Sequence, residues 1–202
     1  MPPKQKYSGI AQRFRGLLPV VIDVETSGLN PYTDALLEIA AVSINMDVNG
    51  KLFCENTYSY NVEPFVGANF DQNALNITGI DPTHPLRYAI PEKQMLHNLF
   101  SILDELLLKT NCRRAVLVGH NAWFDLAFIK AAIERSGFES YPLHSFTTFD
   151  TATLAAATLG ETVLAKAMRK AKIYFDVEKA HSAIYDTEKT AQLFCQMLNR
   201  MK

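Results

Sequence analysis

Two carboxylates stand inside an apolar stretch near the start of the chain, VVIDVETSGL at residues 20–29. Side chains alternate between the two faces of a strand, so Asp23 and Glu25 project together, about 6.5–7 Å apart. No Lys or Arg adjoins them in the sequence, and a buried acid needs a proton, a distant cation or a metal ion to offset its charge. Carboxylate oxygens favour magnesium or manganese over zinc. The pair therefore predicts a site for a divalent cation.

Two further acids occur where helices are expected to begin. Asp125 follows the apolar segment 113–120, in GHNAWFD, and Asp186 lies in the first turn of the last expected helix. Taken alone, each is also explained as a helix-start acid that the helix dipole favours. Four carboxylates at one site carry four negative charges, which two divalent cations would balance while clamping a phosphoryl group. The set as a whole favours a two-metal site.

A histidine precedes the last of these acids. His181 lies five residues before Asp186, and on one helix the two side chains would diverge by roughly 140°. We therefore expect His181 in the loop before the helix, able to reach an attacking water. A histidine of ordinary pKa, about 6.5, suits a general base at neutral pH. Alone, it would be interpreted as a surface or capping histidine.

Strands and helices must bring these groups together. Near-continuous apolar runs predict strands over 19–26 and 36–46, and Asn49-Gly50 predicts a hairpin into a third strand, LFCENTYSYNV. The later segments are expected in this order: a helix opened by Pro91, a buried strand over 113–120, a helix capped by Asn121 and closed by Gly137, a short strand near 147–149, a helix capped by Asp150, and a last helix over about 183–201.

Composition limits the class of protein. The chain has 202 residues, of which 48% are apolar, and no repeat or linker interrupts it. This predicts one α/β domain over 1–202 with a mixed sheet, in which 1–12 form a poorly ordered N-terminal segment. The net charge is −1, so binding to nucleic acid must come from a local patch or from metal ions.

Three cysteines at no metal-ligand spacing, with no targeting segment and no run of 18 apolar residues, predict a cytoplasmic protein without membrane contact.

Three segments that occur in order, DVETSGL, GHNAWFD and HSAIYD, resemble the motifs of the DEDDh 3′→5′ exonucleases. The resemblance extends from about Phe14 to Arg200, because RFRG, VEPFVGAN, GIDPTHP, FDTATLA and AHSAIYDTEKTA are similar to the branch of that family that trims stable RNA. It implies a ribonuclease H-like fold, with a five-stranded mixed sheet flanked by helices.

The resemblance also implies the chemistry and the partners. Two Mg²⁺ ions, for which Mn²⁺ can substitute, would be held by Asp23, Glu25, Asp125 and Asp186. His181 would deprotonate the water that attacks the terminal phosphodiester and releases a nucleoside 5′-monophosphate. The expected substrates are the 3′ ends of tRNA and other stable RNA precursors, and single-stranded DNA. The expected assembly is a homodimer in which a basic patch of one subunit feeds the active site of the other.

Substrate contacts follow from the same resemblance. Arg13, Arg15 and Arg114 match the family's basic patch, although an isolated arginine pair is also typical of a solvated face. Phe124 and Phe146 are candidates to stack on the last bases, and otherwise would be interpreted as core aromatics.

Three further candidates depart from the family pattern. Relatives carry phenylalanine where this chain has Leu29 and Ile77, and glutamate where it has Asn73. Aliphatic side chains stack less well on a base, so we predict weaker discrimination against a 3′-terminal cytosine than the family shows.

Two other functions share the acidic motifs. A proofreading-type DNA exonuclease or an oligoribonuclease would carry them too, but RFRG, VEPFVGAN and Arg113-Arg114 favour the RNA-trimming branch. A catalytically silent nucleic-acid-binding module on the same fold is the alternative from another class. The presence of all five expected active-site residues disfavours it.

Overall fold

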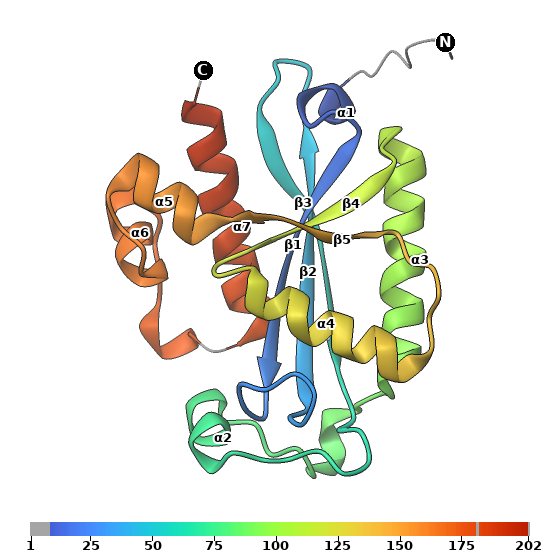
Figure 1. Ribbon diagram of the computed structural model, residues 1–202. Coiled ribbons are helices and arrows are strands. Elements are labelled where there is room, and N and C mark those ends of the chain that lie inside the picture. Colours follow the sequence, from blue (N-terminus) through green and yellow to red (C-terminus); the bar gives the residue numbers. More distant parts are fainter. Residues whose placement is uncertain (1–8, 181, 202) are drawn as a thin grey trace.

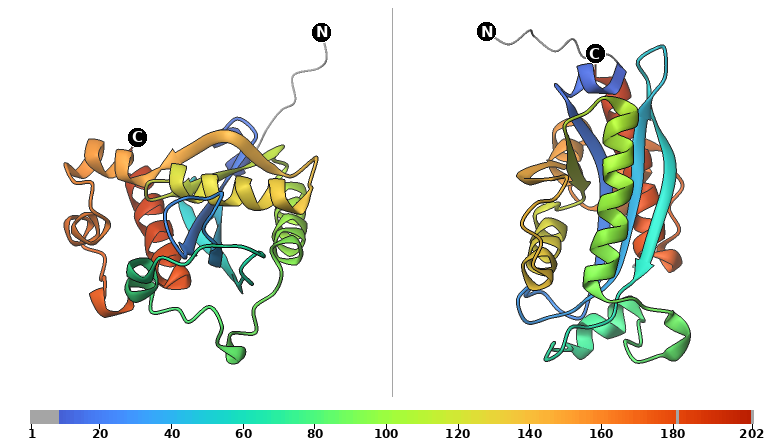
Figure 2. Two further views of the ribbon diagram at one scale, coloured as in Figure 1. Left: turned by 60° about the horizontal axis from the view of Figure 1, so that its bottom comes forward. Right: turned by 90° about the vertical axis from the view of Figure 1, so that its right-hand side faces the viewer.

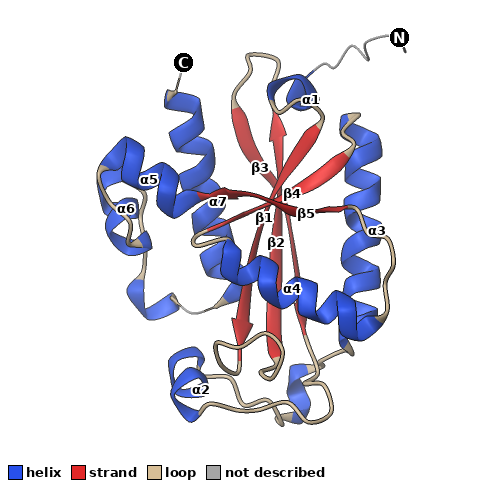
Figure 3. Cartoon of the chain, in the orientation of Figure 1, coloured by secondary structure: helices blue, strands red, loops and turns tan. Residues whose placement is uncertain are grey.

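The computed structural model describes residues 9–180 and 182–201. Its strands are β1 (Leu17–Thr26), β2 (Leu36–Met46), β3 (Leu52–Asn61), β4 (Arg114–Gly119) and β5 (Leu143–Asp150). Its helices are α1 (Gly9–Arg13), α2 (Gln72–Thr78), α3 (Glu92–Thr110), α4 (Trp123–Ser136), α5 (Thr151–Leu159), α6 (Leu164–Ala171) and α7 (Ala183–Arg200), with 3₁₀ turns at Pro85–Arg87 and Val177–Lys179 (Figure 3).

The strands form one mixed sheet in the order β3-β2-β1-β4-β5 (Figure 1). β2 is antiparallel to both β1 and β3, whereas β4 runs parallel to β1 and β5 parallel to β4. β1 is therefore central, which explains why its residues from Leu18 to Ile22 are buried. The predicted five-stranded mixed sheet flanked by helices is confirmed.

Helices cover both faces of the sheet. α7 packs along β1, β2 and β3 on one face, and α4 lies on the other with α3 beside it (Figure 2). Phe194 of α7 and Phe128 of α4 are fully buried in the core. None of the helices in the described part of the chain is long and apolar enough to cross a membrane.

Most of the predicted elements are confirmed, including the β2–β3 hairpin, in which the Asp47 N–H donates to the carbonyl of Lys51 at 2.9 Å. The predicted strand near 147–149 is longer than expected and begins at Leu143. The prediction that Asn121 caps α4 is wrong. Asn121 adopts a left-handed conformation with φ +67°, and Ala122 takes the capping position.

The expectation of a poorly ordered segment over 1–12 is wrong for residues 9–12. These residues belong to α1, whose Ile10 and Ala11 are buried. The physical reason is tertiary, since α1 packs against α3, β1 and β2 and so removes these side chains from water. Residues 1–8 lie outside the described part of the chain.

Candidate active site

Three of the predicted metal ligands meet on one face of the sheet. Asp23 and Glu25 both project from β1, as the alternation requires. Asp186 joins them from the first turn of α7, because that helix packs across β1. One carboxylate oxygen from each of the three lies within 4.8 Å of the others. Such a spacing allows one cation to contact all three side chains.

Asp125 reaches the same region from the other side of β1. β4 ends at Gly119, whereas β1 continues to Thr26. The Val24 N–H therefore has no partner on β4 and donates instead to Asp125 Oδ1 at 3.1 Å. A Cβ atom at Gly119 would stand 2.9 Å from Asp125 Oδ2. The turn from β4 into α4 consequently requires glycine there if this carboxylate is to keep its position.

The electrostatics of the cluster are unfavourable without a cation. Burial raises the pKa of Asp23 well above its ordinary value, and repulsion from the neighbouring carboxylates, Asp125 foremost, raises it further. Burial and the charge of Asp186 raise the pKa of Glu25 to about 8. Burial raises the pKa of Asp125 to about 7, although the Val24 N–H opposes the rise. In the described part of the chain, none of these three carboxylates with a raised pKa forms an ion pair with Lys or Arg.

Glu38 is a further carboxylate, which the sequence prediction missed. It lies opposite Glu25 in the β1–β2 pair, and its charge is among the causes of the raised Glu25 pKa. Burial raises the pKa of Glu38 itself, while Arg87 lowers it. The signal that could have found it is the one used for Asp23, an acid within an apolar strand.

His181, the predicted general base, lies outside the described residues. The neighbouring Ser182 occupies the capping position of α7. The functional prediction for this histidine therefore stays a prediction.

Three predicted substrate contacts, which we call the rim, lie on segments that follow β1 in the chain or pack against it. This rim consists of Leu29, in the loop after β1, and of Asn73 and Ile77 on α2. Leu29 and Ile77 are 81% and 61% exposed. Phe124 lies beside Asp125 in the first turn of α4, half-buried, with its ring 5.0 Å from that of Phe128.

Buried Ser27, just after β1, forms hydrogen bonds with the two segments that carry the rim. Its hydroxyl donates to the carbonyl of Asn69 at 2.5 Å and accepts from the Ala35 N–H at 2.7 Å. Its carbonyl accepts from the Asp71 N–H at 2.7 Å, and Asp71 caps α2. The loop after β1 and the segment before α2 are thus joined at one residue.

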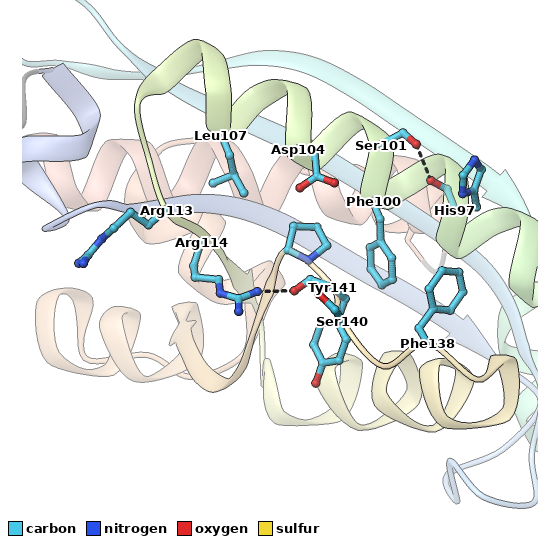
Figure 4. Close-up of a pocket in the computed structure, with 11 residues that line it drawn as sticks. His97, Phe100, Ser101, Asp104, Leu107, Arg113, Arg114, Phe138, Ser140 and Tyr141 are labelled. Carbon is cyan, nitrogen blue, oxygen red and sulfur yellow. Dashed lines mark hydrogen bonds between the residues drawn. The ribbon is translucent and has the colours of Figure 1, made fainter.

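Arg114 and Phe146 lie at the opposite end of the sheet. Arg114 pairs with Leu17 at the start of β1, which places it about 20 Å along the strand from Asp23. Its guanidinium donates to the carbonyl of Tyr141 (Figure 4). The exposed Phe146 shares a pocket of about 430 Å³ with Arg114. Within one chain, the structure does not bring these two residues to the acidic cluster.

The remaining arginines of the predicted patch differ in their surroundings. Arg13 donates to the carbonyls of Gly50 and Leu198 at 2.8 and 2.7 Å, so it ties the β2–β3 hairpin to the end of α7. Arg15 is exposed, and its carbonyl accepts from Arg113 at 3.2 Å. Arg13 therefore has a structural use that the sequence did not indicate.

The family model described as Exonuclease matches residues 20–194, and the chain belongs to this family. It is a hydrolytic 3′→5′ exonuclease. The chain is similar to Ribonuclease T. It is 51% identical over 202 residues to Ribonuclease T of Salmonella choleraesuis (strain SC-B67), and the match covers 100% of this chain and 94% of the relative. It is 55% identical over 195 residues to that of Hahella chejuensis (strain KCTC 2396), covering 96% and 89%.

The solved structures support the fold. Exonuclease I of E. coli, in complex with a dT13 oligonucleotide, matches with a TM-score of 0.69 at 18% identity. The match covers 91% of this chain and 41% of exonuclease I, so the chain spans less than half of that protein. The predicted ribonuclease H-like fold and the predicted family are confirmed.

Proposed function

We propose that this exonuclease trims the single-stranded 3′ ends of tRNA and other stable RNA precursors, and also single-stranded DNA, releasing nucleoside 5′-monophosphates. The observation that carries the proposal is the cluster of Asp23, Glu25 and Asp186, with ligand oxygens within 4.8 Å of one another. The match to Ribonuclease T over nearly the whole chain supports the choice of RNA.

We propose that two Mg²⁺ ions, for which Mn²⁺ can substitute, are the cofactors. The donor set fits them, because it consists of carboxylates. Burial, and then repulsion from neighbouring carboxylates, raise the pKa values of Asp23, Glu25 and Asp125. Asp23, Glu25, Asp125 and Asp186 would hold the ions. When bound, such ions neutralise phosphate charge and favour ionisation of water.

The protein's own residues would do the rest. The rim and Phe124 would hold the terminal nucleotide, and the Val24 N–H would keep the carboxylate of Asp125 aimed at the site. His181 would accept the proton of the attacking water.

We also propose the homodimer. Arg114 lies about 20 Å along the strand from Asp23. At that distance, a basic patch that includes Arg114 would serve the active site of a partner subunit or bind upstream nucleotides. The three free thiols support a cytoplasmic location.

Two alternatives make different predictions. A proofreading-type DNA exonuclease or an oligoribonuclease is not favoured, because identity of 51–55% to Ribonuclease T extends over nearly the full length. Relative rates on precursor tRNA, long single-stranded DNA and dinucleotides test this choice. An inactive binding module would bind a 3′ end and leave it intact.

The decisive experiment uses RNA with a duplex stem and a short 3′ overhang, labelled at either end. With Mg²⁺, a 3′ label should leave at once as a mononucleotide, while a 5′ label should shorten stepwise. EDTA and Asp23→Asn should abolish both. Binding without cleavage in Mg²⁺ or Mn²⁺ would refute the proposed function.

A further inference from the structure

Arg135, near the end of α4, makes an unusual number of directed contacts for a residue outside the acidic cluster. Its guanidinium donates two hydrogen bonds to Glu92, from Nε to Oε2 at 3.0 Å and from Nη2 to Oε1 at 2.7 Å. Its remaining Nη1 donates to the carbonyl of Pro31 at 2.8 Å, and the group lies 4.1 Å from the ring centre of Phe65. The side chains of Arg135 and Glu92 are only 22% and 8% exposed.

These contacts lead to the two segments that carry the rim. Pro31 belongs to the loop that carries Leu29. Phe65 begins a turn in which its carbonyl accepts from Ala68, and the chain continues from there into the cap of α2. The end of α4, the start of α3, the loop after β1 and α2 lie at one end of the molecule (Figure 1).

We propose that Arg135 is a positioning residue for the terminal nucleotide, holding the loop after β1 and the segment before α2 so that Leu29 and Ile77 flank the acidic cluster. This inference rests on the proposed function, because it requires those two side chains to contact the nucleotide. Asp23 and Glu25 stand on β1 and Asp186 on α7, which Arg135 does not touch through any of the contacts described above. Asp125 stands in the first turn of α4, ten residues before Arg135 in the last turn.

Only arginine can make this set of contacts. Its planar fork binds both oxygens of one carboxylate, leaves a third nitrogen for the Pro31 carbonyl, and stacks on an aromatic ring. Lysine keeps the charge but offers a single point of attachment. Loss of Arg135 would therefore loosen the rim, whereas the ligands of the cluster would keep their places.

Two variants test the proposal. Arg135→Lys retains the positive charge, Phe65→Leu retains an apolar side chain, and both leave Glu92 in place. KM and kcat are measured on a trinucleotide, which is too short to reach Arg114, with the active fraction found by titration. Met197→Ala, in the separate cluster of buried residues around α5, α6 and α7, serves as a control for general loss of stability. Leu29→Ala reports whether the rim itself binds the nucleotide.

The expected result is a rise in KM of about tenfold for Arg135→Lys and about threefold for Phe65→Leu. For both, kcat per active site should stay within about twofold of the wild type, and Met197→Ala should leave both constants unchanged. Unchanged KM in Arg135→Lys, with Leu29→Ala raising it, would overturn the role of Arg135 alone. Unchanged KM in Leu29→Ala would overturn the proposed rim contact together with this inference.

Discussion

Replacing Glu25 by glutamine should stabilise the metal-free protein at alkaline pH. Glu25 is 8% exposed, and burial together with Asp186, Glu38 and Asp125 raises its pKa from 4.5 to about 8. The folded protein therefore binds this proton more tightly than the unfolded chain. Glutamine has the same shape and no charge, so it removes the cost of ionisation without leaving a cavity.

The sign and size of the effect follow from linkage. In the wild type, the free energy of unfolding should fall as pH rises from 4.5 to about 8, since only the unfolded chain readily loses the proton there. At about 1.4 kcal/mol for each pKa unit, the ceiling is about 5 kcal/mol. Because relaxation and water penetration reduce such penalties, we expect Glu25→Gln to gain about 1–3 kcal/mol at pH 9 and nothing at pH 4.5.

Urea denaturation in EDTA at pH 4.5, 7 and 9 measures this difference. Glu55→Gln is the matched control, because Lys109 lowers the pKa of Glu55 and neutralisation there brings no gain. Added Mg²⁺ should reverse the order, since glutamine is the poorer ligand. A Glu25→Gln variant no more stable than the wild type at pH 9 in EDTA would refute the interpretation of the cluster as uncompensated charge.

Three further predictions concern other parts of the molecule. Gly119→Ala should weaken metal affinity about 10–100-fold, because the added Cβ would displace the carboxylate of Asp125. Calorimetric titration with Mn²⁺ measures the affinity, and an unchanged value would contradict the prediction. Trimming rates on oligonucleotides ending in C and in A should agree within about tenfold, because the aliphatic rim gives up part of the 1–3 kcal/mol that stacking contributes per base; a strong block at C would contradict it. Arg13→Met should lower the free energy of unfolding by about 1–3 kcal/mol by removing two bonds to carbonyls, whereas exposed Arg15→Met should not; urea denaturation compares the two.

The features that the sequence predicted well are local ones. The period of two on β1 is enough to place Asp23 and Glu25 on one face. Thr190 and Leu193 follow Asp186 at helical spacing and are buried, so the acid at the head of this stripe reaches the sheet. Predictions of this kind need only the geometry of one strand or one helix.

The features that the sequence could not predict depend on contacts between distant segments. Glu38 meets Glu25 only because of the register between β1 and β2. Glu92 and Arg135 are 43 residues apart, and no periodic pattern links them. The order of residues 9–12 likewise comes from packing on α3 and the strands, which propensity alone does not contain.

The difference between cluster and rim suggests why the rim can depart from the family pattern, as the resemblance implies that it does. Asp23 and Glu25 stand on the central strand, where a change of side chain also changes a buried environment. α2 has no buried residue, and Leu29 is mostly exposed. Substitutions at Leu29 and Ile77 therefore cost the core little, since surface changes usually alter stability by less than about 0.5 kcal/mol. Terminal-base selectivity can thus change while the chemistry stays the same, provided that the anchors beneath the rim, Ser27 and Arg135, are kept.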